Sequence, residues 1–200
     1  MTSEPARTIG IFLFDDVEEL DAVGPWEVLA AWCTFWPDDG WRVTTFSVDG
    51  STVTGAKGLR IEPHHSAADV GSLDVVLHPG GQGTRPLLKD PEHLDRVRGW
   101  AETAEITTSV CTGSLVYAAA GLLRDRPATT HWGSLDALAE LDPTIEVRPD
   151  DRYVDDGDIV TSAGVSAGID MALALVARLV SPERSAEVRR YIQYDPEPPY

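Results

Sequence analysis

Short apolar runs recur along the chain, and polar or turn-forming residues bound each of them. Four of these runs cover residues 9–14, 41–48, 73–78 and 106–110. Because the runs lack an alternating polar face, they are typical of strands in a parallel sheet that is covered on both sides. The pattern therefore predicts a buried sheet of mostly parallel strands.

Helical patterns lie between and after these strands, at residues 21–36, 91–103, 112–123 and 166–180. Strands and helices in alternation indicate βαβ units, whose crossovers we expect to be right-handed. The sequence thus predicts an α/β fold with a doubly wound, mostly parallel central sheet flanked by helices.

Two segments depart from this alternation and predict small antiparallel additions. The pair Asp156-Gly157 lies between two short β-type runs, which is a hairpin signal. Residues 50–61 predict a second strand pair. No linker or internal repeat divides the chain, so we expect a single domain over residues 1–200.

The charge of the chain narrows the function classes. Its 200 residues include 16 basic and 33 acidic side chains, and the formal net charge is −17. Such an acidic surface disfavours both nucleic acids and anionic membranes as partners. Two cysteines make no disulfide framework, and no signal peptide or membrane-spanning stretch is visible. We therefore expect a cytoplasmic globular protein.

The end of the run at residues 106–110 carries the most informative chemistry. Cys111 lies at a sharp turn between this strand and a helix, which is the arrangement of a nucleophile elbow. We expect the turn to expose the sulfur and the helix N-terminus to lower the thiol pKa. A buried, purely structural cysteine would fit the same spacing.

Two other strand ends are expected to meet this turn, because ligands bind beyond the carboxyl ends of parallel strands. The glycine-rich turn at residues 79–83 exposes backbone N–H groups. The N–H of Gly81 and that of Thr112 could form an oxyanion-hole-like pair of donors. A plain turn would explain these glycines equally well.

Five acidic residues follow the first strand, and a carboxylate among them could exchange a proton with the thiol. The residue types alone do not select one of the five: Asp15, Asp16, Glu18, Glu19 and Asp21.

Several motifs together resemble the ThiJ/PfpI superfamily and, within it, the isocyanide hydratase group. The similarity extends over nearly the whole chain from residue 9 onwards. It is carried by residues 19–25 (ELDAVGP), 78–81 (HPGG), 108–114 (TSVCTGS), 119–123 (AAGLL), 128–132 (ATTHW), 163–172 (AGVSAGIDMA) and 193–200 (QYDPEPPY).

The resemblance implies a flavodoxin-like, class I glutamine amidotransferase-like fold and a cofactor-free hydro-lyase without a metal. By similarity Cys111 is the nucleophile, Asp21 is the acid that meets it, and Gly81 and Thr112 supply backbone donors. Thr112 stands where the protease-like branch has a histidine, which argues against proteolysis. The implied reaction is hydration of a small isocyanide to an N-substituted formamide, through a thioimidate on Cys111. His131 is expected to be structural.

The resemblance also implies a homodimer with its active site near the subunit interface. Trp26 and Trp132 are candidates to line the pocket. Two other functions remain open. One is a non-catalytic small-molecule or redox sensor, since regulator domains share the Thr-Thr-His-Trp run. The other is a glyoxalase or deglycase acting on α-oxoaldehydes.

Overall fold

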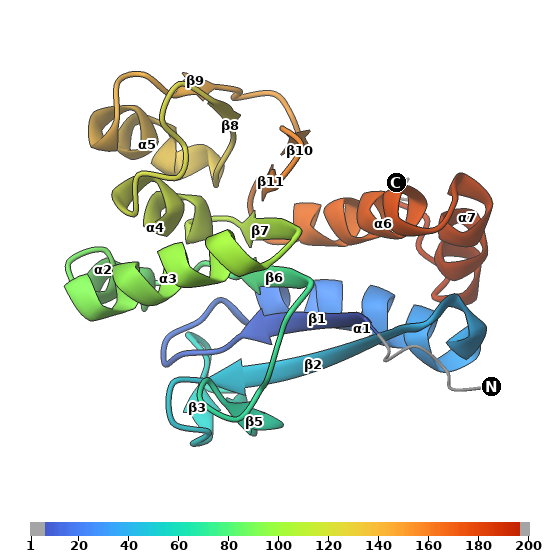
Figure 1. Cartoon of the computed structure of the whole chain (residues 1–200). Coiled ribbons are helices and arrows are strands. Elements are labelled where there is room, and N and C mark those ends of the chain that lie inside the picture. Colours follow the sequence, from blue (N-terminus) through green and yellow to red (C-terminus); the bar gives the residue numbers. More distant parts are fainter. Residues whose placement is uncertain (1–6, 197–200) are drawn as a thin grey trace.

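A computed structural model describes residues 7–196 of the chain (Figure 1). The last residues of the C-terminal motif, 197–200, lie outside the described part. The central sheet has seven strands in the order β10-β11-β7-β6-β1-β2-β5. The strands are β1 (Arg7–Phe12), β2 (Trp41–Ser47), β5 (His65–Ser66), β6 (Val75–His78), β7 (Ile106–Val110), β10 (Tyr153–Asp155) and β11 (Ile159–Ser162).

All neighbouring strands of this sheet are parallel except the β10–β11 hairpin. Two short strand pairs lie outside the sheet. β3 (Val53–Thr54) and β4 (Arg60–Ile61) are antiparallel, whereas β8 (Pro127–Ala128) and β9 (Glu146–Val147) are parallel. The prediction of a mostly parallel sheet with small antiparallel additions is confirmed, and the β8–β9 pair is an element that the pattern did not indicate.

The helices contact one another in two groups. One group contains α1 (Glu19–Phe35), α6 (Ala167–Leu179) and α7 (Pro182–Tyr191). The other contains α2 (Thr84–Leu87), α3 (Pro91–Thr103), α4 (Gly113–Ala119) and α5 (Leu135–Leu141). Figure 1 shows α3 in front of the sheet and α1 behind it, as a doubly wound fold requires. Two 3₁₀ turns, η1 (Pro37–Asp39) and η2 (Trp132–Ser134), complete the elements.

The bounds of α1, α3 and α6 lie within two residues of the predicted helices, α4 is shorter than predicted, and α2, α5 and α7 are helices that the pattern did not indicate. α4 ends at Ala119, four residues before the predicted end. Gly121 follows it with a φ of +80°, a left-handed conformation that commonly terminates a helix. Leu123 still packs fully buried, so its apolar character reflects the core and not a longer helix.

The strand order places a topological switch at the carboxyl end of β1. β6 and β7 lie on one side of β1 and β2 lies on the other. Chain segments therefore leave in opposite directions after β1 and β6, and the loops there diverge to open a crevice. α6 packs tightly against this edge, because a Cβ at Gly168 would lie 3.1 Å from the Val110 side chain and 3.2 Å from Pro25.

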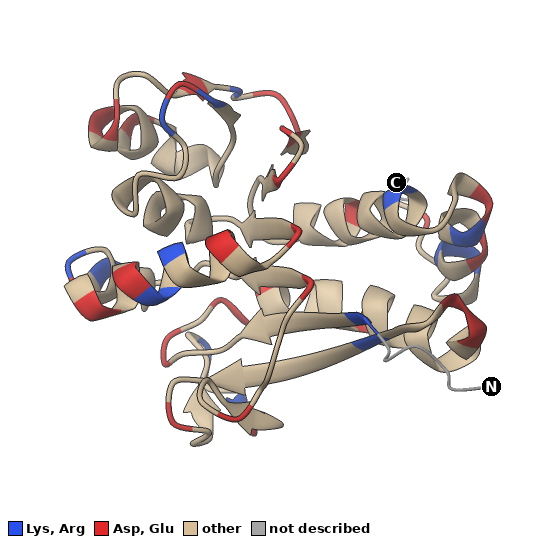
Figure 2. Ribbon diagram, viewed as in Figure 1, with Lys and Arg blue, Asp and Glu red and all other residues tan. Residues whose placement is uncertain are grey.

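Charged side chains surround this core. Figure 2 shows acidic and basic residues on the helices, the connecting loops and the outer ends of strands. The described parts of β6 and β7 contain none. Within residues 7–196 no helix has the length and apolar character needed to cross a membrane.

Candidate active site

Cys111 follows β7 directly and adopts the strained backbone of a nucleophile elbow. Its φ is +56°, in the left-handed region that disfavours residues with a Cβ. Hydrogen bonds from three segments hold it there. Its N–H donates to the carbonyl of Ser162 (3.0 Å), and its own carbonyl accepts from the hydroxyls of Thr130 (2.8 Å) and Ser114 (3.1 Å). The predicted strand–turn–helix geometry is confirmed.

Asp21 lies in the first turn of α1 and is fully buried. Its Oδ2 accepts a hydrogen bond from the N–H of Gly80 at 3.0 Å, and its Oδ1 has no hydrogen-bond partner among the described residues. Burial raises the pKa of the Asp21 carboxyl to about 7, and the charge of Glu18 adds to the rise. The Gly80 N–H and the Cys111 thiol oppose it. This acid is therefore poised to exchange protons near neutral pH.

The Cys111 thiol and the Asp21 carboxyl act on each other electrostatically. Burial raises the pKa of Cys111 to about 12, and the neighbouring Asp21 charge contributes to the rise. The N–H and hydroxyl of Thr112 favour the thiolate but do not outweigh these effects. The expectation of an exposed sulfur with a lowered pKa is wrong, since Cys111 is only 6% exposed. Desolvation of the thiolate is the largest cause of the raised pKa.

The glycine-rich turn after β6 closes over this pair. A Cβ at Gly80 would lie 2.5 Å from the backbone nitrogen of Thr112 and 2.8 Å from Asp21 Oδ2. Gly81 has a φ of +120°, and its N–H donates to the hydroxyl of Thr112 at 3.0 Å. Both glycines are needed for this close approach. The Gly81 N–H is thus already paired, and a substrate that uses it must displace the Thr112 hydroxyl.

A pocket of about 160 Å³ opens in front of the thiol. Cys111, Thr112 and Gly81 line it, whereas the buried Asp21 does not. Gln82 and Arg85, which follow Gly81, also line it, and the remaining lining residues come from four other segments: Glu18, Ala56, His131 with Ser134, and Val165. Most of these residues escaped the sequence reasoning, because loops from distant parts of the chain bring them together. Glu18 was one of the five candidate acids and His131 lies in a family motif, whereas Ala56, Arg85 and Ser134 gave no signal.

Two lining residues have constrained conformations. His131 Nδ1 accepts a hydrogen bond from the N–H of Gly133 (3.2 Å) and so caps η2, consistent with a structural role. Val165 has a φ of +56°, which is strained for a β-branched residue. Strain of this kind costs about 1–3 kcal/mol and persists only where the surroundings enforce it.

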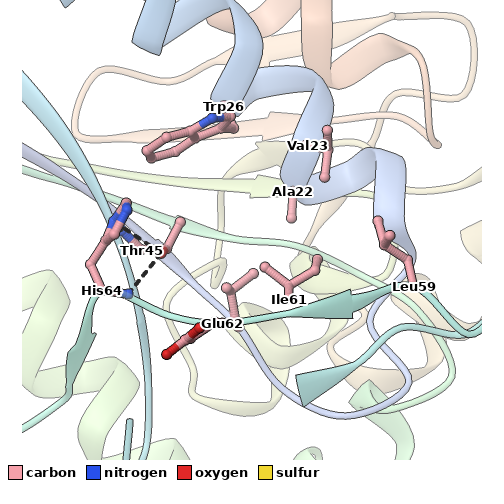
Figure 3. Close-up of a pocket in the computed structure, with 9 residues that line it drawn as sticks. Ala22, Val23, Trp26, Thr45, Leu59, Ile61, Glu62 and His64 are labelled. Carbon is pink, nitrogen blue, oxygen red and sulfur yellow. Dashed lines mark hydrogen bonds between the residues drawn. The ribbon is translucent and has the colours of Figure 1, made fainter. Parts of the chain in front are cut away.

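A second, larger pocket of about 320 Å³ lies along the other side of α1 (Figure 3). Trp26 and Val23 of α1 face Leu59, Ile61 and the other residues that line it. Trp26 therefore belongs to this pocket, and Trp132 is 80% exposed and lines neither of the two. The expectation that these tryptophans line the thiol pocket is wrong. The larger pocket has no cysteine in its lining, whereas the smaller one is lined by Cys111.

The chain is similar to several known proteins. The family model described as the DJ-1/PfpI family matches residues 7–178. An isonitrile hydratase of Pseudomonas putida is 42% identical over 196 residues, which cover 98% of this chain and 82% of that protein. The HTH-type transcriptional regulator GbdR of Pseudomonas aeruginosa (strain UCBPP-PA14) is 29% identical over 94% of this chain but only 51% of the regulator.

A solved structure agrees with the sequence relatives. The crystal structure of a THiJ/PfpI family protein from Pseudomonas syringae superposes with a TM-score of 0.86 and 32% identity. The match covers all of this chain and 81% of that one.

Proposed function

The chain belongs to the DJ-1/PfpI family, and from this premise we propose that it hydrates isocyanides, R–N≡C, to N-substituted formamides. Cys111 is the nucleophile and Asp21 is the acid and base. The proposal rests on one observation. The buried Asp21 carboxyl, whose pKa is raised to about 7, lies beside the Cys111 thiol, which retains its proton. The 42% identity to an isonitrile hydratase supports the choice of substrate class.

The first step adds the thiol across the terminal carbon of the isocyanide. The Asp21 carboxylate accepts the proton of Cys111, and the thiolate attacks the carbon. Asp21 then returns the proton to that carbon, and the product is the thioimidate R–N=CH–S–Cys111. Asp21 is suited to both transfers because its pKa lies close to the working pH.

The second step adds water to the same carbon. The Asp21 carboxylate removes a proton from water as the water oxygen attacks, and it passes this proton to the imine nitrogen. Collapse of the tetrahedral adduct expels the sulfur, which takes up the hydroxyl proton of the adduct, and releases R–NH–CHO. The sum is one isocyanide and one water to one formamide. We assign the N–H groups of Thr112 and Gly81 as hydrogen-bond donors to the negative charge that develops on the oxygen added to the carbon bonded to sulfur.

The pocket favours small substituents. Its volume of about 160 Å³ is close to that of a cavity of about 150 Å³ that holds a benzene molecule. Phenyl or cyclohexyl isocyanide is therefore a suitable test substrate. The lining combines the charges of Glu18 and Arg85 with the apolar Ala56 and Val165.

The test is formamide production from these isocyanides, followed for wild type, Cys111→Ala and Asp21→Asn. We expect turnover by wild type only. Cys33→Ala is the matched control, because Cys33 packs against the core away from the pocket lining. Its rate should equal that of wild type. Turnover by Cys111→Ala at the wild-type rate would reject the covalent route.

The same assay separates the alternatives. Activity on methylglyoxal without activity on isocyanides would reassign the chain to α-oxoaldehyde chemistry. Binding without turnover of either compound would favour a sensor, a role consistent with the 29% identity to part of a transcriptional regulator.

We also propose that the protein is a cytoplasmic homodimer. A reducing compartment would keep Cys111 as the thiol that this mechanism requires. The exposed apolar side chains Leu20, Val23 and Leu59 lie on α1 and on the segment before β4. This surface is the one we assign to the second copy. Light scattering should give twice the monomer mass for wild type and a lower mass for Val23→Asp.

A further inference from the structure

Two buried histidines lie in contact beneath the glycine-rich turn. His78 ends β6, and His93 lies in the first turn of α3. Both are fully buried, and their Nε2 atoms are 3.0 Å apart. The Nδ1 of His78 lies 2.8 Å from the carbonyl oxygen of Pro79. None of the steps proposed above uses this pair.

The contacts determine which ring nitrogens carry protons. A carbonyl oxygen only accepts, so the Nδ1 of His78 must donate to Pro79. The neutral ring then has a bare Nε2, and His93 must donate its Nε2–H to it. This leaves His93 Nδ1 without a proton, which agrees with its having no partner among the described residues. The opposite tautomers would place two lone pairs against each other at the Pro79 carbonyl.

This hydrogen-bonded chain ends at the proposed catalytic acid. The Pro79 carbonyl and the Gly80 N–H belong to one planar, trans peptide group. His78 holds the carbonyl end of that group, and the N–H end donates to Asp21 Oδ2 at 3.0 Å. Rotation of the peptide would break both hydrogen bonds together.

We propose that His93 is a positioning residue, which fixes the tautomer of His78 and thereby the Pro79–Gly80 peptide that presents its N–H to Asp21. The assignment rests on the proposed function in taking Asp21 as the group that moves protons. The group that binds one ring nitrogen of a functional histidine often sets which nitrogen carries the proton. Here the partner of the histidine is another histidine, and the recipient is a peptide N–H.

The pair acts as a fixed donor and does not titrate in the working range. Burial lowers the pKa of His78 to about 3 and that of His93 to about 4. Arg96 also lowers the pKa of His93, and Asp90 opposes it. The charged group that acts on Asp21 is Glu18, and the Cys111 thiol acts on it through a hydrogen bond. A change in the pH dependence of Asp21 in a His93 variant would therefore report the peptide and not the imidazoles.

The test compares two substitutions of His93. His93→Gln keeps an N–H donor near the position of Nε2, whereas His93→Leu removes it. The readout is the ¹³C resonance of the Asp21 carboxyl as a function of pH, assigned with Asp21→Asn. A hydrogen bond to a charged group is worth about 1.5–3 kcal/mol, so its loss should raise the Asp21 midpoint by about 1–2 pH units. We expect that rise in His93→Leu and the wild-type midpoint in His93→Gln.

A merely structural role would lower stability without moving this midpoint, so an unchanged midpoint in folded His93→Leu would overturn the proposal. Should His93→Leu fail to fold, the tautomers of the wild-type protein decide. Long-range ¹H–¹⁵N NMR should find the proton of His78 on Nδ1 and that of His93 on Nε2. The reverse assignment would refute the proposed positioning role of His93. Neither measurement needs an isocyanide, so a lack of turnover would count against the proposed function alone.

Discussion

Asp21→Asn should make the protein more stable above pH 7 and less stable near pH 4.5. Burial raises the pKa of the carboxyl from its ordinary value of 3.8 to about 7. A folded pKa above the unfolded one gives stability that is complete below pH 4 and is lost as the pH rises through 7. Each pKa unit of difference between the folded and unfolded states corresponds to about 1.4 kcal/mol. The free energy of unfolding of wild type therefore falls by about 4 kcal/mol over this pH range.

The amide does not titrate, so the variant avoids this loss. It keeps an oxygen for the Gly80 N–H, but its NH₂ group takes the place of the unpartnered Oδ1. An unpaired buried amide costs about 1–3 kcal/mol at every pH. At pH 8.5 the free energy of unfolding of Asp21→Asn should therefore exceed that of wild type by about 1–3 kcal/mol. At pH 4.5 it should be lower than that of wild type.

Urea unfolding of wild type and variant between pH 4.5 and 8.5 measures the difference directly. Asp38→Asn is the matched control, because Asp38 is exposed and the same chemical change there should alter stability by less than about 0.5 kcal/mol. A stability difference for Asp21→Asn that stays constant across the range would refute the claim that burial sets the pKa of this carboxyl.

Three further changes test other parts of the site. Gly80→Ala should abolish turnover, because its Cβ would lie 2.5 Å from the Thr112 nitrogen; Gly99→Ala, in open space on α3, should instead stabilise the protein by about 0.5–1 kcal/mol in urea unfolding. Val165→Gly should be more stable than Val165→Ala by about 1 kcal/mol, the reverse of the usual order, because Val165 has a positive φ. The kcat/KM for an isocyanide should rise with pH to a plateau above about 7, as Asp21 ionises; a profile that is flat from pH 5 to 9 would remove Asp21 from the proton transfer.

The sequence could predict the fold because local pattern and tertiary burial agree along most of the chain. Residues 106–110 read as a buried strand and form β7, and the Asp156-Gly157 turn joins β10 to β11. The pattern was insufficient where apolar residues serve the core outside a regular element, as Leu123 does after α4. The pairing of β8 with β9 was also out of reach, because each strand has only two residues.

The site was partly predictable for a similar reason. The position of Cys111 follows from a strand, a turn and a helix that are contiguous in the sequence. The choice of Asp21 among five acids came only from the family resemblance, because burial separates it from the others and burial is a tertiary property. The contact between His78 and His93 depends on how α3 lies against β6, which no local pattern encodes.

The incorrect expectation for the thiol pKa has a consequence for the chemistry. A helix N-terminus favours a thiolate, but burial and the Asp21 charge raise the pKa of the Cys111 thiol to about 12. Intrinsic nucleophilicity falls as a thiol pKa falls, so a thiolate formed only at the moment of attack is the stronger nucleophile. The terminal carbon of an isocyanide must form two new bonds, one to the sulfur and one to a proton. A preformed thiolate would bring no proton, whereas a thiol beside a carboxylate with a pKa of about 7 can deliver both to one carbon.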